Sequence, residues 1–214
     1  MQKMDYLNRM QQAGVIAVVR ADDADTAVKL SQAVIAGGVT GIELTFTVPH
    51  ADQAITTLVD QYHDDASVII GAGTVLDATT ARIAIMNGAQ FIVSPSFNQE
   101  VAEICNLYAV PYVPGCMTPT EMQSALIAGV DLVKLFPGNV LKPDMVKAVM
   151  APFPFLSIMP SGGVSVENMA DWFAAGVSAV GAGSNLTKAG LSGDFAAVTE
   201  TAKAYRAELD KIRK

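Results

Sequence analysis

This chain is poor in charged residues, cysteines and long hydrophobic runs. Only 16% of its 214 residues are charged and 51% are hydrophobic, so it can bury a sizeable core. No apolar run approaches the roughly 18 residues that span a bilayer. The two cysteines, Cys105 and Cys116, have neither a CxxC nor a zinc-ligand spacing. These absences exclude a disordered chain, a membrane-spanning segment and a cysteine-based metal site.

Basic residues are outnumbered, with 14 Lys and Arg against 21 Asp and Glu, which gives a net charge of -7. This balance argues against a nucleic-acid partner, but a pocket that gathers a few cations can still bind a small anion. The first segment, MQKMDYLNRMQQAG, lacks the apolar stretch of a signal peptide, so we expect a cytoplasmic protein with no membrane partner. His50 and His63 belong to no cluster of metal-ligating residues, and we expect no metal.

Short β-branched runs alternate with longer amphipathic stretches along the whole chain. The predicted strands cover residues 15–20, 40–46, 67–73, 90–94, 111–115, 131–136, 156–163 and 178–184. The predicted helices cover residues 2–13, 24–38, 50–62, 78–88, 98–108, 118–129, 143–151, 166–176 and 194–212. Eight strand–helix units favour a parallel (β/α)8 TIM barrel with an extra N-terminal helix, forming one domain over residues 1–214. An open doubly wound sheet is the alternative.

Charge occurs inside or at the end of apolar strands at three notable places, Arg20, Glu43 and Lys134. In GIELTF, Ile42 and Leu44 share the face that suits a helix layer, so Glu43 points into the barrel. The same alternation points Lys134 and Arg20 inward. Because catalytic groups gather at the C-terminal strand ends of such barrels, we expect these three side chains to converge at one mouth.

These three side chains suit chemistry on a keto acid. An amine among apolar walls loses hydration, which favours its neutral form, and a neutral amine can form a Schiff base with a ketone. We therefore predict that Lys134 is the nucleophile, Glu43 its proton-transfer partner and Arg20 a bidentate carboxylate ligand. The alternatives are a structural Lys134–Glu43 ion pair and an Arg20 that faces solvent. Buried ion pairs are poor stabilisers, which favours the catalytic interpretation.

Glycine clusters follow the last two predicted strands, in PSGGVS at 160–165 and GAGS at 181–184. Glycines let backbone amides approach an oxyanion, and a helix beginning after Ser165 would add partial positive charge. Barrels often bind phosphate after strands seven and eight. Two clusters in register with the strand count therefore predict a phosphate site, although either one alone could be ordinary turn chemistry.

The strand-end segments GIELTF, IGAGTVLD, FIVSPSFN, YVPGCMTPTE, VKLFPG, PSGGVSVEN and GAGSNL resemble those of one enzyme family. It is the class I 2-keto-3-deoxy-6-phosphogluconate (KDPG) aldolases, which include the 4-hydroxy-2-oxoglutarate (KHG) aldolases. The resemblance covers roughly residues 10–190. It implies a (β/α)8 barrel that assembles as a homotrimer, needs no metal or cofactor, and acts on a small, phosphorylated 2-keto acid.

The resemblance also implies roles for individual residues. Lys134 matches the Schiff-base lysine and Glu43 the proton-shuttling glutamate, while Thr45 and Thr74 match threonines that line the pyruvate end. Phe136 matches an aromatic ring that closes over the substrate. The phosphate end is implied to comprise Ser161, Gly162, Gly163, Gly183 and Ser184.

Two positions depart from the family pattern. Many members have a carboxylate-binding arginine four residues after the glutamate, where this chain has Thr47. Similar proteins with the E-x-T-F-T-V-P form carry an arginine at the end of the first strand, so the resemblance gives that role to Arg20. Ser161 stands where the family has the threonine of T-G-G, and it keeps the hydroxyl but loses a methyl group.

The reaction expected from both lines of reasoning is Schiff-base cleavage of KDPG to pyruvate and glyceraldehyde 3-phosphate, as in the Entner–Doudoroff type of carbohydrate metabolism. Cleavage of KHG to pyruvate and glyoxylate, or of the galactonate epimer KDPGal, is the alternative within the class. An isomerase or epimerase on a phosphate-binding barrel is a more distant alternative, and a noncatalytic phosphometabolite-binding protein is another.

Overall fold

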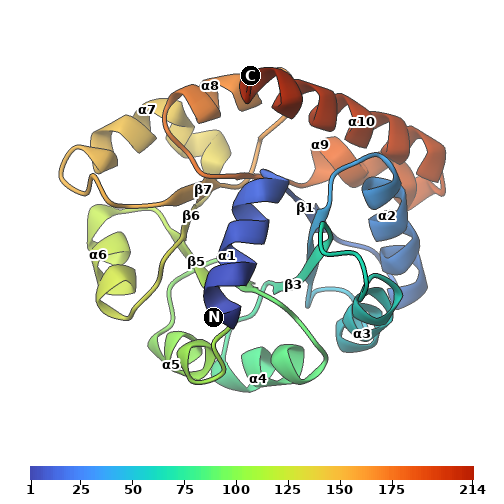
Figure 1. Ribbon diagram of the computed structural model, residues 1–214, viewed down its shortest axis with the longest axis horizontal. Helices are drawn as coiled ribbons and strands as arrows, with labels where there is room; N and C mark the ends of the chain where they lie inside the picture. Colours follow the sequence, from blue (N-terminus) through green and yellow to red (C-terminus); the bar gives the residue numbers. More distant parts are fainter.

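Eight parallel strands form the inner wall of the molecule, and the computed structural model describes residues 1–214 (Figure 1). They are β1 (Val15–Val19), β2 (Gly41–Thr45), β3 (Ile69–Gly73), β4 (Ile92–Ser94), β5 (Tyr112–Cys116), β6 (Val133–Leu135), β7 (Ile158–Pro160) and β8 (Val180–Ala182). Their order is β7-β6-β5-β4-β3-β2-β1-β8, and a parallel bridge between Ser161 and Gly181 joins the two ends. The predicted (β/α)8 barrel is confirmed, and the doubly wound alternative is wrong because the strand order is sequential around the ring.

The helices surround this wall as a ring, except α1, which lies across the middle of the barrel (Figure 1). They are α1 (Gln2–Ala13), α2 (Ala24–Ala36), α3 (Ala51–Gln61), α4 (Ala78–Met86), α5 (Gln99–Leu107), α6 (Pro119–Ile127), α7 (Gly138–Met150), α8 (Met169–Ala174), α9 (Ser184–Thr187) and α10 (Phe195–Ile212), with a 3-10 turn at Lys188–Ser192. None of the helices has the length and apolar character needed to cross a membrane.

Helix α1 lies across the middle of the barrel in Figure 1, at the N-terminal ends of the strands. Its Met10 and Ala13 are buried in one cluster with the barrel-interior side chains of Ile16, Ile69 and Phe91. Burial of this much apolar surface stabilises the closed end, since each large side chain contributes roughly 1.5–3 kcal/mol. The helix therefore covers the end of the barrel opposite the C-terminal strand ends.

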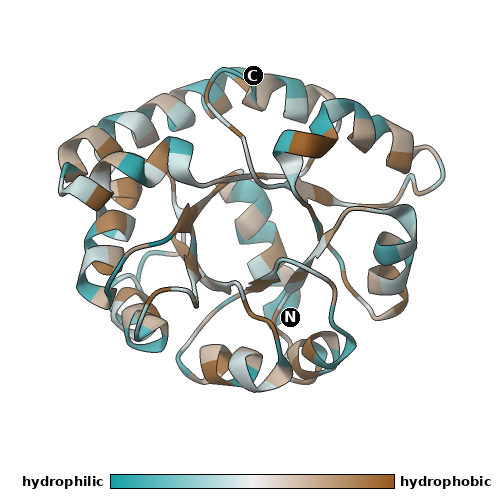
Figure 2. Cartoon of the chain, turned by 180° about the vertical axis from the view of Figure 1, so that it is seen from behind, coloured by the Kyte–Doolittle hydropathy of each residue, from teal (hydrophilic) through white to brown (hydrophobic).

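Alternate residues along the strands face opposite sides of the wall, as the pleat requires. On β2, Ile42 and Leu44 join the large core cluster between strands and helices, and Glu43 lies between them on the inner side. On β6, both neighbours of Lys134 belong to the same cluster. Viewed from behind in Figure 2, the strands around the centre are mostly hydrophobic, and hydrophilic residues are concentrated on the surrounding helices. The few polar side chains on the inner side are therefore exceptions to an apolar wall.

The starts of two helices differ clearly from the sequence prediction and one further helix was not predicted, all three in the second half of the chain. Helix α7 begins at residue 138 instead of 143. It is interrupted at Lys142, with φ 57° and ψ 165°, because Pro143 has no amide hydrogen to donate along the helix. Helix α8 begins at residue 169, so Ser165 does not start it; the Ser165 amide donates instead to the Asn168 side chain at 2.9 Å. Helix α9 was not predicted, because four residues are too few to show a helical period.

Candidate active site

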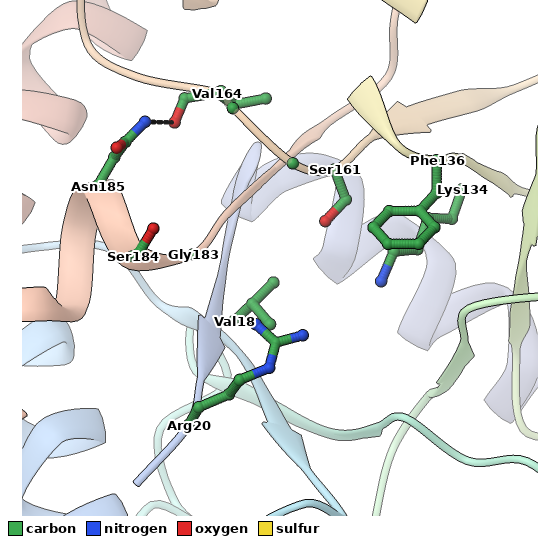
Figure 3. A pocket seen from close by; sticks show the side chains of 11 residues that line it. Val18, Arg20, Lys134, Phe136, Ser161, Val164, Gly183, Ser184 and Asn185 are labelled. Carbon is green, nitrogen blue, oxygen red and sulfur yellow. Dashed lines mark hydrogen bonds between the residues drawn. The ribbon is translucent and has the colours of Figure 1, made fainter. Parts of the chain in front are cut away.

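The C-terminal ends of β1, β6, β7 and β8 enclose a cavity of about 150 Å³ (Figure 3). Two of its walls are the loops that follow β7 and β8, and the cations come from β1 and β6. It is lined by Val18, Arg20, Lys134, Phe136, Ser161, Gly162, Gly163, Val164, Gly183, Ser184 and Asn185. The lining contains two cations and no acidic residue, so the cavity suits an anionic ligand although the chain as a whole is acidic.

A lysine and a glutamate meet inside the barrel wall. The Lys134 Nζ atom lies 3.5 Å from Oε1 of Glu43, and their side chains are 6% and 1% exposed. Strand β6 presents Lys134 and strand β2 presents Glu43, and both are turned inward by the alternation of their strands. Because the surroundings exclude water, their mutual interaction is much stronger than that of a surface pair.

The Glu43 carboxylate has no hydrogen-bond partner in the protein on either oxygen, although both oxygens are buried. Gly73 on β3 makes room for it, since a Cβ atom at that position would collide with the carboxylate. A buried carboxylate without donors is costly, and such groups are retained mainly where they have a chemical task. The carboxylate therefore has the Lys134 amine as its ion-pair partner, and Glu43 itself does not line the cavity.

The Phe136 ring stands beside the lysine, with Nζ of Lys134 5.1 Å from the ring centroid. The ring is half-buried and lines the cavity next to the amine (Figure 3). At this distance the ring face attracts the charged amine, and the ring also shields it from solvent. Phe136 therefore restricts the directions from which a ligand can approach the amine.

Arg20 follows the end of β1, and its side chain extends into the same space as Ser161 and Lys134 (Figure 3). The residue is exposed, and its guanidinium forms no ion pair, so its donors are available to a ligand. Thr47, four residues after Glu43, has a hydroxyl that lies 2.7 Å from the Thr45 hydroxyl. Arg20 is therefore the only guanidinium in the lining of the cavity.

Two of the sequence-predicted ligand residues do not line the cavity. Thr45 is fully buried, and its hydroxyl donates to the Val19 carbonyl at 3.1 Å, which ties β2 to β1. Thr74 follows β3 with a left-handed φ of 56°. Neither threonine is among the residues that line the cavity.

The loop after β7 turns through two consecutive glycines, with φ 98° at Gly162 and 74° at Gly163. Only glycine adopts such angles readily, and a Cβ atom at Gly163 would also lie 2.8 Å from that of Asn139. The amides of Gly163 and Val164 donate to no acceptor in the protein. The Ser184 hydroxyl faces the same space from the loop after β8 (Figure 3). This end of the cavity therefore offers several donors to an oxyanion.

Three lining residues were not singled out from the sequence: Val18, Val164 and Asn185. Val18 lies on the same face of β1 as Arg20, so the alternation of that strand was a usable signal. Asn185 directly follows Ser184, and its side-chain amide donates to the Val164 carbonyl at 3.0 Å, across two loops. The sequence gives no sign of this hydrogen bond, because Asn185 and Val164 are 21 residues apart and belong to no common repeat.

The histidines and cysteines of the chain lie outside the cavity. His50 and His63 are exposed, and no group of three His, Cys, Asp or Glu residues is arranged to hold a metal ion. Cys116 ends β5 inside the core with 1% exposure, and Cys105 is fully buried on α5. Burial raises the pKa of each thiol to about 12.

We expect both thiols to be inert in the folded protein. With pKa values near 12, the thiolate fraction at neutral pH is on the order of a thousandfold lower than for an ordinary thiol, and burial blocks access as well. Titration with a disulfide reagent should find no reactive thiol under native conditions and two in urea, the number of cysteines in the chain. A thiol that reacts rapidly without denaturant would contradict this assignment.

The chain is similar to known aldolases over most of its length. A family model for KDPG and KHG aldolase matches residues 7–201. A 2-dehydro-3-deoxy-6-phosphogalactonate (KDPGal) aldolase of Escherichia coli K12 is 37% identical over 195 residues, which cover 90% of this chain and 94% of the relative. A 2-dehydro-3-deoxy-phosphogluconate (KDPG) aldolase of Treponema pallidum is 37% identical over 166 residues, or 77% of this chain and 78% of the relative. The solved structure of a Legionella pneumophila KDPG aldolase, with pyruvate captured as a covalent carbinolamine intermediate, matches with a TM-score of 0.85 and 26% identity, covering 96% of this chain and 98% of that one.

Proposed function

Because the chain belongs to the KDPG and KHG aldolase family of carbon–carbon lyases, we propose that it cleaves KDPG to pyruvate and glyceraldehyde 3-phosphate through a Schiff base on Lys134. The observation that carries the proposal is the buried contact of 3.5 Å between the Lys134 amine and the Glu43 carboxylate. Of this pair, Lys134 lines a cavity that also presents the Ser184 hydroxyl and backbone amides without an acceptor in the protein.

The first half of the reaction forms the covalent intermediate. The neutral amine of Lys134 adds to the C2 ketone of the substrate and gives a carbinolamine, with Glu43 accepting the proton that the amine loses. Return of a proton to the carbinolamine oxygen releases water and leaves a cationic iminium. The iminium withdraws electrons from C3, which makes cleavage of the C3–C4 bond feasible. Lys134 itself supplies the electron sink, so the balance of the reaction requires no metal or redox cofactor.

The second half breaks the carbon–carbon bond. Glu43 removes the C4 hydroxyl proton, directly or through one water, as the electrons of the C3–C4 bond move to the iminium and glyceraldehyde 3-phosphate departs. The resulting enamine takes a proton at C3. Water then adds to the regenerated iminium, and its hydrolysis releases pyruvate and the free amine of Lys134. The partnerless oxygens of Glu43 support this assignment, since a proton shuttle needs a free acceptor.

The lining of the cavity offers donors for both anionic groups of the substrate. Arg20 binds the carboxylate, with its planar donors suited to bidentate contact. The distal phosphate is held by Ser184 and by the loop containing Ser161, Gly162 and Gly163, with Gly183 allowing close approach at the start of α9. Thr45 and Thr74 act from behind the cavity wall, where they set the position of neighbouring strand ends. Arg20, Lys134, Ser161 and Ser184 surround one space in Figure 3, which supports binding of a single ligand by all four.

One assay of pyruvate release from KDPG, KHG and KDPGal tests the proposal. We expect pyruvate release, coupled to lactate dehydrogenase, to be faster on KDPG than on KHG, because only KDPG carries the phosphate. Replacing Ser184 by alanine should raise KM for KDPG about three- to tenfold, the value of one hydrogen bond, and leave KM for KHG unchanged. Equal effects on both substrates would remove Ser184 from the phosphate end. No pyruvate from any of the three would overturn the proposed function.

The galactonate epimer KDPGal is the second candidate substrate. The E. coli relative named for that activity is 37% identical over 90% of this chain. Ser161 also stands where the family pattern has a threonine, and its hydroxyl lines the cavity beside Lys134 (Figure 3). A ratio of kcat/KM that favours KDPGal over KDPG in the same assay would assign the chain to the epimer.

We also propose that the enzyme is a homotrimer in the cytoplasm. Family membership supports the trimer, and large exposed apolar side chains such as Leu107 and Ile127, at 73% and 81% exposure, suit burial between subunits. The two unpaired cysteines support a reducing compartment. Light scattering on the purified protein should give three times the mass of the 214-residue chain. A concentration-independent monomer mass would contradict the trimer.

A further inference from the structure

The loop after β7 is held by hydrogen bonds to its carbonyls, while its amides face the cavity. The Ser161 carbonyl accepts from the Gly138 amide at 2.8 Å, and the Gly163 carbonyl accepts from the Asn168 side chain at 2.9 Å. In a planar trans peptide the N–H points opposite to the C=O. Binding of the Gly163 carbonyl on the outside therefore turns the Val164 amide in the opposite direction, and Val164 lines the cavity.

The Val164 carbonyl is a further point at which this loop is tied to the rest of the protein. It accepts two hydrogen bonds, one from the Asn185 side chain at 3.0 Å and one from the Tyr205 hydroxyl at 3.0 Å. Asn185 comes from α9, which follows β8, and lies directly beside Ser184, as Figure 3 shows. Tyr205 comes from α10, which lies behind the strands and does not line the cavity. One carbonyl thus joins three separate segments.

The Tyr205 hydroxyl can only serve as a donor here. The side chain is 1% exposed, and burial, reinforced by the negative charge of Glu167, raises the pKa of the phenol above its usual range. A buried phenol that stays protonated needs an acceptor, and the Val164 carbonyl is the one it has. The hydroxyl therefore keeps its proton at neutral pH and can donate it to the Val164 carbonyl.

We propose that Asn185 and Tyr205 are positioning residues for the phosphate end of the cavity. Asn185 fixes the separation between Ser184 and the amides of Gly163 and Val164, and Tyr205 anchors the shared carbonyl to the helix layer. A phosphate needs donors from both loops at once. If one loop moves, the affinity of the site for phosphate falls even though every donor is still present. The proposal rests on the proposed function in taking the distal anion to be a phosphate.

The test removes the two donors separately and together. Y205F deletes one hydroxyl without changing the ring, and N185A deletes the amide of an exposed residue. We expect each to raise KM for KDPG about three- to tenfold, with kcat unchanged, and the double variant to raise it further than either. KM for KHG and borohydride trapping of pyruvate, which carry no phosphate, should remain at wild-type values. Affinity for inorganic phosphate, measured by calorimetry, should fall by the same factor as for KDPG.

Tyr112 provides a matched control. It is also a buried tyrosine, and its hydroxyl holds the loop after β4 through the Ser96 carbonyl at 3.1 Å, in a segment that does not line the cavity. Y112F should therefore leave the ratio of the two KM values and the phosphate affinity unchanged. If Y205F fails to fold, the phosphate affinity of N185A decides whether the positioning role stands.

The outcomes separate this proposal from the proposed function. Unchanged phosphate affinity in N185A and Y205F, or equal effects on phosphorylated and unphosphorylated ligands, would overturn the positioning role while wild-type turnover stands. A wild-type protein that releases no pyruvate from any 2-keto acid would overturn the proposed function. Calorimetry with inorganic phosphate would still decide the positioning role, because it requires no turnover.

Discussion

Replacing Lys134 with methionine is expected to lower kcat by a factor on the order of 10⁴ or more, because the covalent electron sink is lost and no other residue can supply it. Methionine keeps the length and apolar stem of lysine, so the cavity keeps its shape. The measurement is pyruvate release from KDPG by the purified variant. As a control, K147M removes an exposed lysine of α7 and should retain wild-type activity.

Covalent trapping tests the same prediction by identifying the lysine that binds pyruvate. Pyruvate with borohydride should reduce the Schiff base, inactivate the wild-type enzyme irreversibly and add one reduced pyruvate at Lys134, located by peptide mass mapping. K134M should remain unlabelled and K147M should be labelled like the wild type. A label on any other lysine, or undiminished turnover in K134M, would rule out the covalent mechanism.

A loss of activity in K134M must be shown to come from the missing amine and not from unfolding of the variant. Removing one partner of a buried ion pair leaves the other charge uncompensated, which costs about 3–5 kcal/mol. Glu43 would be left without any partner, since neither of its oxygens accepts a hydrogen bond. The double variant K134M/E43Q removes that charge and should recover part of the stability in urea denaturation, with activity still absent. Recovery of stability without recovery of activity assigns the loss to chemistry.

Replacing Glu43 with glutamine is expected to lower kcat about 10²- to 10⁴-fold, the usual contribution of a general acid–base group. Glutamine has the same shape but cannot accept the C4 hydroxyl proton. The Lys134 amine remains in place, so pyruvate and borohydride should still label it on prolonged incubation. The variant should therefore separate formation of the intermediate from cleavage of the carbon–carbon bond.

The same variant distinguishes the two interpretations of the buried contact. If Glu43 serves only as an ion-pair partner, E43Q should change stability and leave kcat close to the wild-type value, and the catalytic role would be abandoned. E100Q on α5 is the matched control, since it removes an exposed carboxylate of the same type at a distance from the cavity. We expect E100Q to match the wild type in both activity and stability.

The sequence was sufficient to predict the barrel and the side of the wall on which its ionic residues lie. Strand alternation in GIELTF and DLVKLF is a local property, because each side chain is directed by the backbone of its own strand. The alternation therefore predicted that Glu43 and Lys134 point away from the helix layer, before any contact between them was known. The 3.5 Å distance between them was not predictable, since it depends on how β2 and β6 are placed across a closed barrel.

Thr45 shows what the strand pattern leaves open. The pattern puts it on the same face as Glu43, and the resemblance makes it a ligand of the pyruvate end, which stays a prediction. In the folded chain its hydroxyl donates to the Val19 carbonyl of β1 and contacts Thr47. The pattern specifies the side of the sheet on which a residue lies, but the pairing of its polar atoms depends on neighbours from other strands.

By itself, the sequence determined the class of fold, the inward direction of its few interior charges and the two glycine clusters that follow the last strands. These follow from period, steric freedom and the cost of burying charge, all of which act over a few residues. Only the tertiary structure decided which polar atoms are already paired. The Val164 carbonyl binds Asn185 and Tyr205, which lie 21 and 41 residues further along the chain, and such contacts exist only once the barrel has closed.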